Sequence, residues 1–313
     1  MITTLGNTGL RVTRIGLGLA ALGRPGYINL GHAADLAGHT DIAAMERAAH
    51  DVLDAAYAGG VRYFDAARSY GKAEAFLGSW LQARGLGRDD VTVGSKWGYT
   101  YTAGWRTDAE VNEVKDLTAA TFRRQLAETR ELLGHHLRLY QIHSATLDSG
   151  VLDDAEVRNE LAALRQTGVF IGFTTTGPSQ AATIERALEV GGFDTVQSTF
   201  NLLERSAGPA LAAAHGAGLG VLIKEALANG RLTDRGDMQG LTTAAHDAGT
   251  TPDALALAFV LSQPWVDVAL SGATTIEQLE SNLGTLKVDP EPLEDLVEDP
   301  ATYWHARSEL PWN

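Results

Sequence analysis

Short runs of strand-forming residues alternate with longer helical patterns along almost the whole chain. The runs lie at 15–17, 61–65, 91–96, 137–143, 170–174, 195–199, 220–223 and 266–270. Helical patterns fill the segments between them, among them 42–58, 117–133, 155–167 and 252–262. Strands that alternate with helices predict βα units and a parallel sheet.

The helix boundaries carry residues that favour a start or a stop. Thr251 precedes Pro252, and a Thr cap followed by proline at the first helical position is a good helix start. Glycines follow the predicted helices at 59–60, 134, 168 and 191–192, where a left-handed stop is favoured. Eight strands with crossover helices close naturally into a (β/α)₈ barrel. The alternative, an open doubly wound sheet, is weakened because no G-x-G-x-x-G follows the first strand.

Three segments outside the regular alternation are informative. Residues 5–12 read as a hairpin, which we expect to cover the bottom of the barrel. The irregular loops 23–40 and 97–116 follow the first and third strands. Both leave the C-terminal ends of barrel strands, where enzymes of this architecture build their active sites.

Composition narrows the class of protein. The 313 residues are 44% hydrophobic, which is enough for a large core, and we expect one domain over residues 1–313. The formal net charge of -14 argues against binding nucleic acid or an anionic membrane. The chain has no cysteine, so disulfides and thiolate metal sites are excluded, and no segment has the apolar length of a membrane span. We expect a cytoplasmic protein without a metal.

Four polar side chains stand at or just beyond the ends of consecutive predicted strands. They are Asp65, Tyr70, Lys96 and His143. Each alone has an ordinary interpretation, as a helix cap, a packed ring, a solvated cation or a satisfied polar group. Neighbouring strand ends of a barrel converge on one mouth, however, so the four side chains are predicted to share one site.

The sequence resembles the aldo-keto reductase superfamily through the spacing of those four residues and through the motifs at 5–10, 15–18 and 272–274 with Asn282. The resemblance covers nearly the whole chain. It implies that Tyr70 exchanges a proton with the reacting oxygen and that Lys96, paired with Asp65, lowers the pKa of Tyr70. It also implies that His143 orients a carbonyl group.

The same resemblance implies a set of cofactor-binding residues. Phe200 stands where a ring stacks on the nicotinamide, with core packing as the alternative, and Glu225 takes a place that is usually small and polar. The full set implied is Gly18, Asp65, Thr174, Thr175, Gln197, Phe200, Leu227, Gly272, Thr274, Gln278 and Asn282.

The choice between NADP and NAD stays open. The family favours NADP, yet residues 272–278 contain no Lys or Arg to hold a 2′-phosphate. A cation from another loop, such as Arg231, would restore that preference.

Aromatic residues in the two loops and near residue 312 are predicted to frame the pocket of a carbonyl or sugar substrate. They are Tyr27, Trp97, Tyr99, Trp105, Trp304 and Trp312. Alternatives are an NAD-dependent sugar or alcohol dehydrogenase, a cofactor-binding regulatory subunit with little turnover, and a Schiff-base aldolase using Lys96 or Lys224. The sequence leaves the physiological substrate and the oligomeric state open.

Overall fold

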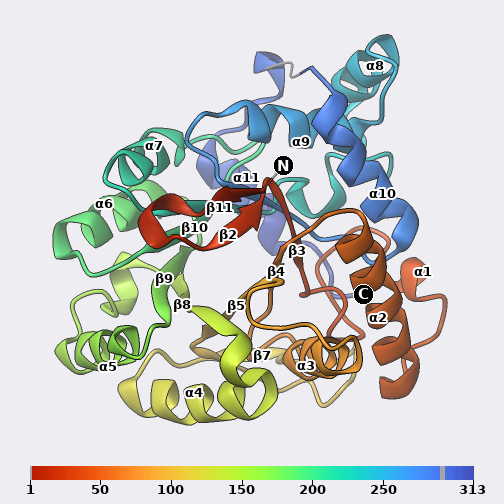
Figure 1. Ribbon diagram of the computed structural model, residues 1–313. Coiled ribbons are helices and arrows are strands. Elements are labelled where there is room, and N and C mark those ends of the chain that lie inside the picture. Colours follow the sequence, from red (N-terminus) through yellow and green to blue (C-terminus); the bar gives the residue numbers. More distant parts are fainter. Residues whose placement is uncertain (1, 290–292) are drawn as a thin grey trace.

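A computed structural model describes residues 2–289 and 293–313. Eight parallel strands form a closed barrel in the order β3–β4–β5–β8–β9–β10–β11–β12, with β12 pairing back to β3 (Figure 1). The strands are β3 (Ile15–Gly18), β4 (Tyr63–Asp65), β5 (Thr92–Trp97), β8 (Leu137–Ala145), β9 (Phe170–Thr175), β10 (Thr195–Thr199), β11 (Gly220–Lys224) and β12 (Val268–Ser271). The (β/α)₈ barrel predicted from the alternation is confirmed.

Helices surround the barrel and connect successive strands. They are α2 (Ile42–Ala58), α3 (Ala73–Ala83), α4 (Ala119–Leu133), α5 (Ala155–Gln166), α6 (Gln180–Val190), α7 (Gly208–Gly216), α8 (Gln239–Asp247) and α9 (Pro252–Ser262), followed by α10 (Ile276–Gly284) and α11 (Pro300–Ser308). The predicted helices 42–58 and 252–262 match α2 and α9 residue for residue. Asp41 caps α2 by accepting a hydrogen bond from the backbone N–H of Ala44.

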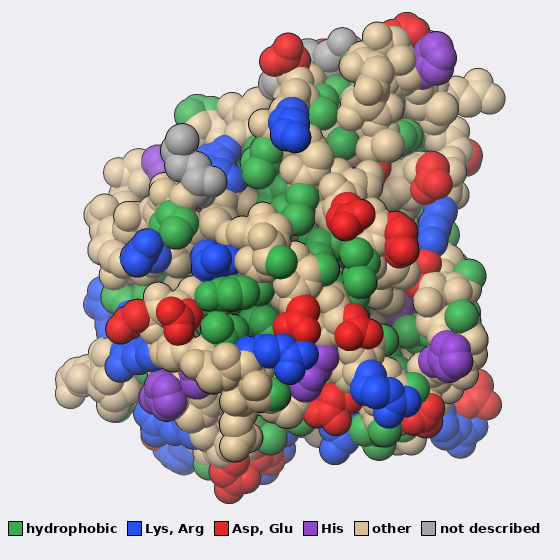
Figure 2. All heavy atoms as spheres, turned by 45° about the vertical axis from the view of Figure 1, so that its right-hand side comes forward, with side chains coloured by type: hydrophobic (Ala, Val, Ile, Leu, Met, Phe, Trp, Pro, Cys, Tyr) green, Lys and Arg blue, Asp and Glu red, His purple; other side chains and the backbone are tan. Residues whose placement is uncertain are grey.

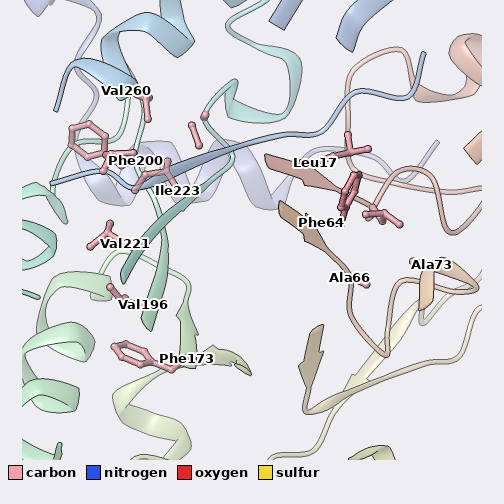
Figure 3. Packing of buried hydrophobic residues seen from close by; sticks show 14 of the residues in the cluster. Leu17, Phe64, Ala66, Ala73, Phe173, Val196, Phe200, Val221, Ile223 and Val260 are labelled. Atoms are coloured by element: carbon pink, nitrogen blue, oxygen red, sulfur yellow. The ribbon is translucent and has the colours of Figure 1, made fainter. Parts of the chain in front are cut away.

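The main hydrophobic core lies between the barrel and the surrounding helices (Figure 3). A second, smaller core fills the bottom of the barrel. There Leu5, Leu10 and Val12 pack with residues that point inward from the strands, namely Tyr63, Leu139, Leu222 and Val268.

The hairpin of β1 (Ile2–Thr4) and β2 (Arg11–Thr13) closes this end, as the sequence predicted. Its turn is anchored because Gly6 N donates to Asp267 Oδ2 (3.3 Å) and Asn7 N donates to Gly218 O (3.0 Å). The barrel is therefore open only at its C-terminal mouth, as far as the described residues show.

The two long loops meet other parts of the chain at that mouth. The loop after β3 contains the short helix α1 (His32–Leu36), and its Tyr27 exchanges two backbone hydrogen bonds with Asn313. The loop after β5 forms an antiparallel hairpin of β6 (Tyr99–Tyr101) and β7 (Glu113–Lys115), which the sequence did not predict. Among residues 2–289 and 293–313, no helix has the length and apolar character needed to cross a membrane.

Candidate active site

A cavity of about 620 Å³ opens at the C-terminal mouth of the barrel. Twelve of the residues that the sequence predicted to be catalytic or to bind the cofactor or substrate line this cavity. They are Gly18, Tyr27, Asp65, Tyr70, Tyr99, His143, Gln197, Leu227, Gly272, Gln278, Asn282 and Trp312. They come from both ends of the sequence, and the closure of the barrel brings them together.

Asp65 and Lys96 form a buried ion pair at the floor of the cavity. Asp65 is the last residue of β4, and its Oδ1 accepts hydrogen bonds from Tyr63 Oη (3.0 Å), Gln197 Nε2 (3.2 Å) and Gln141 Nε2 (3.3 Å). Lys96 Nζ also donates to the backbone oxygen of Ala66 (3.0 Å). A buried ion pair needs such additional bonds to offset the loss of water.

Tyr70 lies directly above this pair, with Lys96 Nζ 4.7 Å from the centre of its ring. Burial, followed by the charge of Asp65, raises the pKa of Tyr70 above its ordinary value. The resemblance had implied a pKa lowered by Lys96, and the net direction here is the opposite. The physical reason is that burial penalises the phenolate and that Asp65 opposes the positive charge of Lys96. Tyr70 is thus a protonated phenol at neutral pH.

His143 faces Tyr70, with ring centres 5.5 Å apart and planes at 84°. Burial, and then the charges of Lys96 and Lys224, lower the pKa of His143 well below its ordinary value. The imidazole is therefore neutral, and its buried Nδ1 has no hydrogen-bond partner in residues 2–289 and 293–313.

A bulge in β8 lies at the position of His143. The pairing with β9 shifts register between Ile142 and Ala145, and Ser144 adopts a left-handed φ of 59°. Its backbone N–H donates to Thr174 Oγ1 (2.7 Å). Bulges of this kind re-aim a side chain beside an active site.

The far end of the cavity carries polar groups suited to the adenosine half of a dinucleotide. Gly272 follows β12, and α10 begins after the cap Thr275, whose side chain accepts from Gln278 N. The Gln278 side chain accepts from Thr274 N (2.9 Å) and donates to Asp35 Oδ2 (2.9 Å).

Asn282 stands one turn further along α10. Its side chain accepts from Ser271 Oγ (2.7 Å) and donates to Asp253 Oδ2 (2.7 Å). Asn229, after β11, lines the cavity with a buried Oδ1 that has no hydrogen-bond partner among the described residues. This unpartnered buried acceptor and a helix start at one end of a long cavity fit a dinucleotide cofactor.

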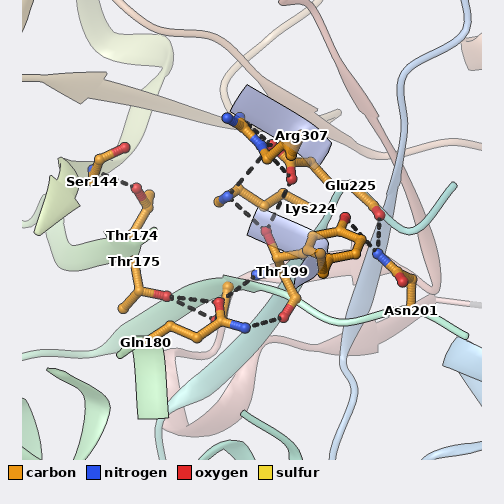
Figure 4. Close-up of polar contacts among 11 residues, drawn as sticks. Ser144, Thr174, Thr175, Gln180, Thr199, Asn201, Lys224, Glu225 and Arg307 are labelled. Atoms are coloured by element: carbon orange, nitrogen blue, oxygen red, sulfur yellow. Dashed lines mark hydrogen bonds and ion pairs between the residues drawn. The ribbon is translucent and has the colours of Figure 1, made fainter. Parts of the chain in front are cut away.

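Several residues expected at the cofactor are turned away from the cavity. Thr174 is engaged with Ser144, and Thr175 Oγ1 pairs with Ser198 Oγ (2.8 Å) (Figure 4). Thr274 is buried and does not line the cavity. Ser144 and Thr176 line the cavity near the end of β9 instead.

Phe200 belongs to the hydrophobic core and not to the cavity. Its ring stacks on Phe259 at 5.8 Å and meets Trp265 edge-on at 4.9 Å, on the side of the barrel that faces α9 (Figure 3). The nicotinamide-stacking role is therefore wrong, and the alternative of core packing holds. The residue directly follows β10, where alternation directs successive side chains to opposite faces.

Three of the expected substrate rings also lie elsewhere. Trp97 is fully buried against Phe122 (5.1 Å). Trp105 lines a separate hollow near α3 and α4, and its indole N–H donates to Thr40 O. Trp304 lies near Lys224 and Arg307 without lining the cavity.

Glu225, which looked unfavourable beside a pyrophosphate, is held by cations (Figure 4). It adopts a left-handed φ of 53°, and Arg307 Nε donates to both of its carboxylate oxygens (2.9 and 3.0 Å). Burial would raise the pKa of Glu225, but Arg307 and then Lys224 lower it to about 2. Burial lowers the pKa of Lys224 to about 8.

Charged residues that the sequence analysis did not assign to the site also line the cavity. They include Arg24, Glu113, Arg235 and Arg307, the last from α11. No local signal marks these positions, because loop packing and the docking of α11 bring them to the mouth. Arg231, suggested as a phosphate-binding cation, pairs with Glu298 instead.

Comparison with known proteins agrees with this geometry. Residues 14–297 match the Aldo/keto reductase family. An uncharacterized oxidoreductase of Bacillus subtilis, YrpG, is 26% identical over 91% of each chain. The L-galactose dehydrogenase of Arabidopsis thaliana is 26% identical over 94% of this chain and 92% of its own.

Solved structures show the same architecture. The aldo-keto reductase AKR11C1 from Bacillus halodurans, in a holo form, superposes with a TM-score of 0.72 at 20% identity, covering 98% of this chain and 95% of its own. The Pseudomonas aeruginosa protein PA4992, assigned to the aldo-keto reductases, gives a TM-score of 0.67 at 26% identity over 91% and 94%. The chain therefore belongs to the aldo/keto reductase family and is an NAD(P)H-dependent oxidoreductase.

Proposed function

We propose that the protein transfers hydride between a nicotinamide cofactor and a small aldehyde, ketone or sugar, with Tyr70 as the proton donor. The observation that carries this proposal is the meeting of a protonated Tyr70 and a neutral His143 on one cavity wall. Both stand above the paired charges of Asp65 and Lys96. This set serves proton transfer to an oxygen atom at neutral pH.

When bound, the nicotinamide would supply the hydride for the carbonyl carbon in reduction. His143 donates a hydrogen bond to the carbonyl oxygen of the substrate and fixes its position, while Tyr70 gives its hydroxyl proton to the same atom. The phenolate that remains lies beside the ammonium of Lys96, which stabilises it. Asp65 keeps that ammonium in place, and in oxidation the phenolate takes the proton back.

For the cofactor, we propose that Gly272, Gln278 and Asn282 hold the adenosine half. Gln197, whose side chain reaches Asp65, would hold the nicotinamide end together with groups at the end of β9. Ser144 and Thr176, which line the cavity, replace Thr174 and Thr175 in this role.

For the substrate, Tyr27, Tyr99 and Trp312 form the aromatic part of the wall. Aromatic faces bind carbonyl compounds and the apolar faces of sugars. The name of the Arabidopsis relative, L-galactose dehydrogenase, favours sugar oxidation as the second candidate activity. The absence of cysteine fits our proposal of a cytoplasmic location.

Replacing Tyr70 tests the proposal. Tyr70→Phe should reduce turnover by roughly 10² to 10⁴, the usual contribution of general acid–base catalysis. The dissociation constant of the cofactor, measured by fluorescence titration, should stay nearly unchanged. Tyr57→Phe, in α2 and outside the cavity lining, is the matched control and should retain most activity. The substrates are a panel of aldehydes and sugars with both cofactors.

Turnover of the Tyr70→Phe variant within tenfold of wild type would remove Tyr70 from the mechanism. Cofactor binding without turnover of any substrate in the panel would favour the regulatory-subunit alternative. A covalent adduct trapped by borohydride would favour the aldolase.

A further inference from the structure

Arg24 is a buried cation that packs directly against Tyr70, the proposed proton donor. It lies in the loop after β3, with 2% of its surface exposed. Its guanidinium carbon is 5.2 Å from the ring centre of Tyr70 and 4.6 Å from that of Trp312. Tyr27 contacts it from a third side at 5.1 Å. The guanidinium group of an arginine carries a positive charge in proteins.

Hydrogen bonds fix the guanidinium in this position. Nη1 donates to the backbone oxygen of Ser69 (3.0 Å), the residue before Tyr70, and forms an ion pair with Glu113 of β7. The buried Nε has no partner within the described protein. Arg24 therefore connects the loop after β3, the loop of Tyr70, the β6–β7 hairpin and the segment around Trp312.

The backbone segments that carry Arg24 and Tyr70 pack closely against each other at Gly23 and Gly71. A Cβ on Gly23 would lie 2.2 Å from the backbone oxygen of Tyr70. Gly71 has a left-handed φ of 58°, and a Cβ there would lie 2.4 Å from the oxygen of Gly23. Lys72 N donates to that same oxygen (2.7 Å). These contacts hold Arg24 and Tyr70 at a fixed separation.

We propose that Arg24 is a positioning residue for Tyr70: it holds the ring between itself and the site floor, and it supplies positive charge beside the phenol. This inference rests on the proposed role of Tyr70. The charge is needed because the carboxylate of Asp65 opposes that of Lys96.

The charged groups around Tyr70 predict the direction in which each substitution should change the pKa of Tyr70. Asp65, Glu113 and Glu225 raise the pKa of Tyr70, whereas Arg24 lowers it. The other titratable groups that face the site are Lys96, the neutral His143, Tyr27, Tyr63 and Lys224. Arg24 and Glu113 are ion-pair partners, yet their charges act on the phenol in opposite directions.

The experiment is the pH dependence of turnover, at saturating cofactor and alcohol, in the direction of oxidation, where Tyr70 must lose its proton. Arg24→Met should move the rising limb of the profile to higher pH by about one unit, so that the rate below the limb falls about tenfold. Glu113→Gln should move the same limb to lower pH. Arg24→Lys, which keeps the charge, should leave the limb near the wild-type position while turnover falls.

If Arg24 had only a structural role, Arg24→Met and Glu113→Gln would both lower turnover, but the rising limbs of their pH profiles would not move in opposite directions. Limbs that stay in place, or that move in the same direction, would overturn the inference. If Arg24→Met does not fold, Glu113→Gln and Arg24→Lys still decide it, since an unmoved limb in Glu113→Gln also overturns it. Full activity of Tyr70→Phe would instead refute the proposed function, and this result is distinguishable because it does not involve Arg24.

Discussion

Asp65 joins four strands of the barrel through one side chain. Its carboxylate receives hydrogen bonds or an ion pair from Tyr63 on its own strand β4, Lys96 on β5, Gln141 on β8 and Gln197 on β10. A group that binds several strands at once affects stability as well as chemistry, and the two effects can be separated by comparing variants.

Asp65→Asn keeps the shape of the side chain but leaves the buried ammonium of Lys96 without a countercharge. Removing one partner of a buried ion pair costs about 3–5 kcal/mol of unfolding free energy. We expect a loss of that order in urea denaturation, together with a loss of turnover. Asp108→Asn is the control, since Asp108 pairs with Arg106 on the open surface and should change the unfolding midpoint very little. Equal effects of the two substitutions would contradict the structural role of Asp65.

The sequence alone located the four proposed catalytic residues but not the charged residues around them. Asp65, Lys96 and His143 were predictable because each stands at the C-terminal end of a strand, and the barrel gathers those ends. Arg24 and Arg307 were not, because each reaches the cavity from an irregular loop or from α11 through tertiary packing. Phe200 was misplaced because a position just beyond β10 fixes the residue in sequence but not the face to which its ring points.

Elements differ in how well the pattern defines them. Barrel strands and helices were predictable because every βα unit packs its strand and its helix against the core. The side chains buried in this way give each element its hydrophobic pattern in the sequence. The β6–β7 hairpin has no buried face of its own: Tyr99, Thr100 and Tyr101 are all partly exposed, so periodicity gives no signal there. The pairing of Tyr27 with Asn313 joins segments far apart in the sequence, and no local pattern reports such a contact.

The N-terminal hairpin is expected to contribute to stability and not to catalysis, because it closes the end of the barrel away from the cavity. Leu5 is fully buried in the lower core. Leu5→Ala should lower the unfolding free energy by about 2–5 kcal/mol, the range for removing a buried leucine side chain. Ile2→Ala, at a position 46% exposed on the same hairpin, should change it little. A changed cofactor dissociation constant in a still-folded Leu5→Ala variant would contradict this separation of roles.

The helix α11 is held to the barrel by a buried charge pair that depends on pH. The pKa of Glu225 in the folded protein is about 2, below the ordinary value of 4.5. A depressed pKa stabilises the folded state above pH 4.5, and this contribution is lost as the pH falls toward 2. Its size is on the order of 3 kcal/mol, because the pKa of Glu225 falls from 4.5 to about 2 on folding.

The corresponding measurement is the unfolding free energy of wild type and Glu225→Gln between pH 6 and pH 3. The difference between the two proteins should shrink as the pH falls through this range. Arg307→Lys, which keeps a cation near Glu225, should retain part of the wild-type dependence. Parallel curves for wild type and Glu225→Gln would show that Glu225 does not titrate in this way.

Across the whole molecule, the excess of acidic residues coexists with extensive pairing. Acidic side chains stand beside basic ones over most of the face shown in Figure 2. Arginines near the cavity follow the same rule: Arg24 pairs with Glu113, Arg307 with Glu225, and Arg235 with Asp35. These three arginines are therefore already paired with carboxylates. This pairing affects how the cavity would distinguish NADPH from NADH.

At the adenosine end of the cavity, the described lining includes one arginine and three carboxylates: Arg235, Asp234, Asp253 and Glu277. Arg235 donates from Nη1 to Asp35 Oδ2 (2.8 Å) and pairs with the other oxygen as well. Its charge is thus neutralised by a side chain that also accepts from Gln278. A 2′-phosphate brought to this end would meet carboxylates and a cation that is already paired.

We therefore predict that the protein binds NADPH less than about a hundredfold more tightly than NADH, the factor that roughly two charge-assisted hydrogen bonds supply. Asp35→Asn should shift the preference toward NADPH, because it keeps a hydrogen-bonding side chain beside Gln278 while releasing the charge of Arg235. Gln278→Arg should shift it the same way by adding a cation at a position that lines the cavity, and Arg235→Met in the Asp35→Asn background should reverse the gain. Fluorescence titration of both cofactors against each variant gives the ratios directly. If the wild-type protein prefers NADPH by a thousandfold or more, Arg235 is not neutralised by Asp35 in the bound state, and a cation in this part of the cavity holds the phosphate.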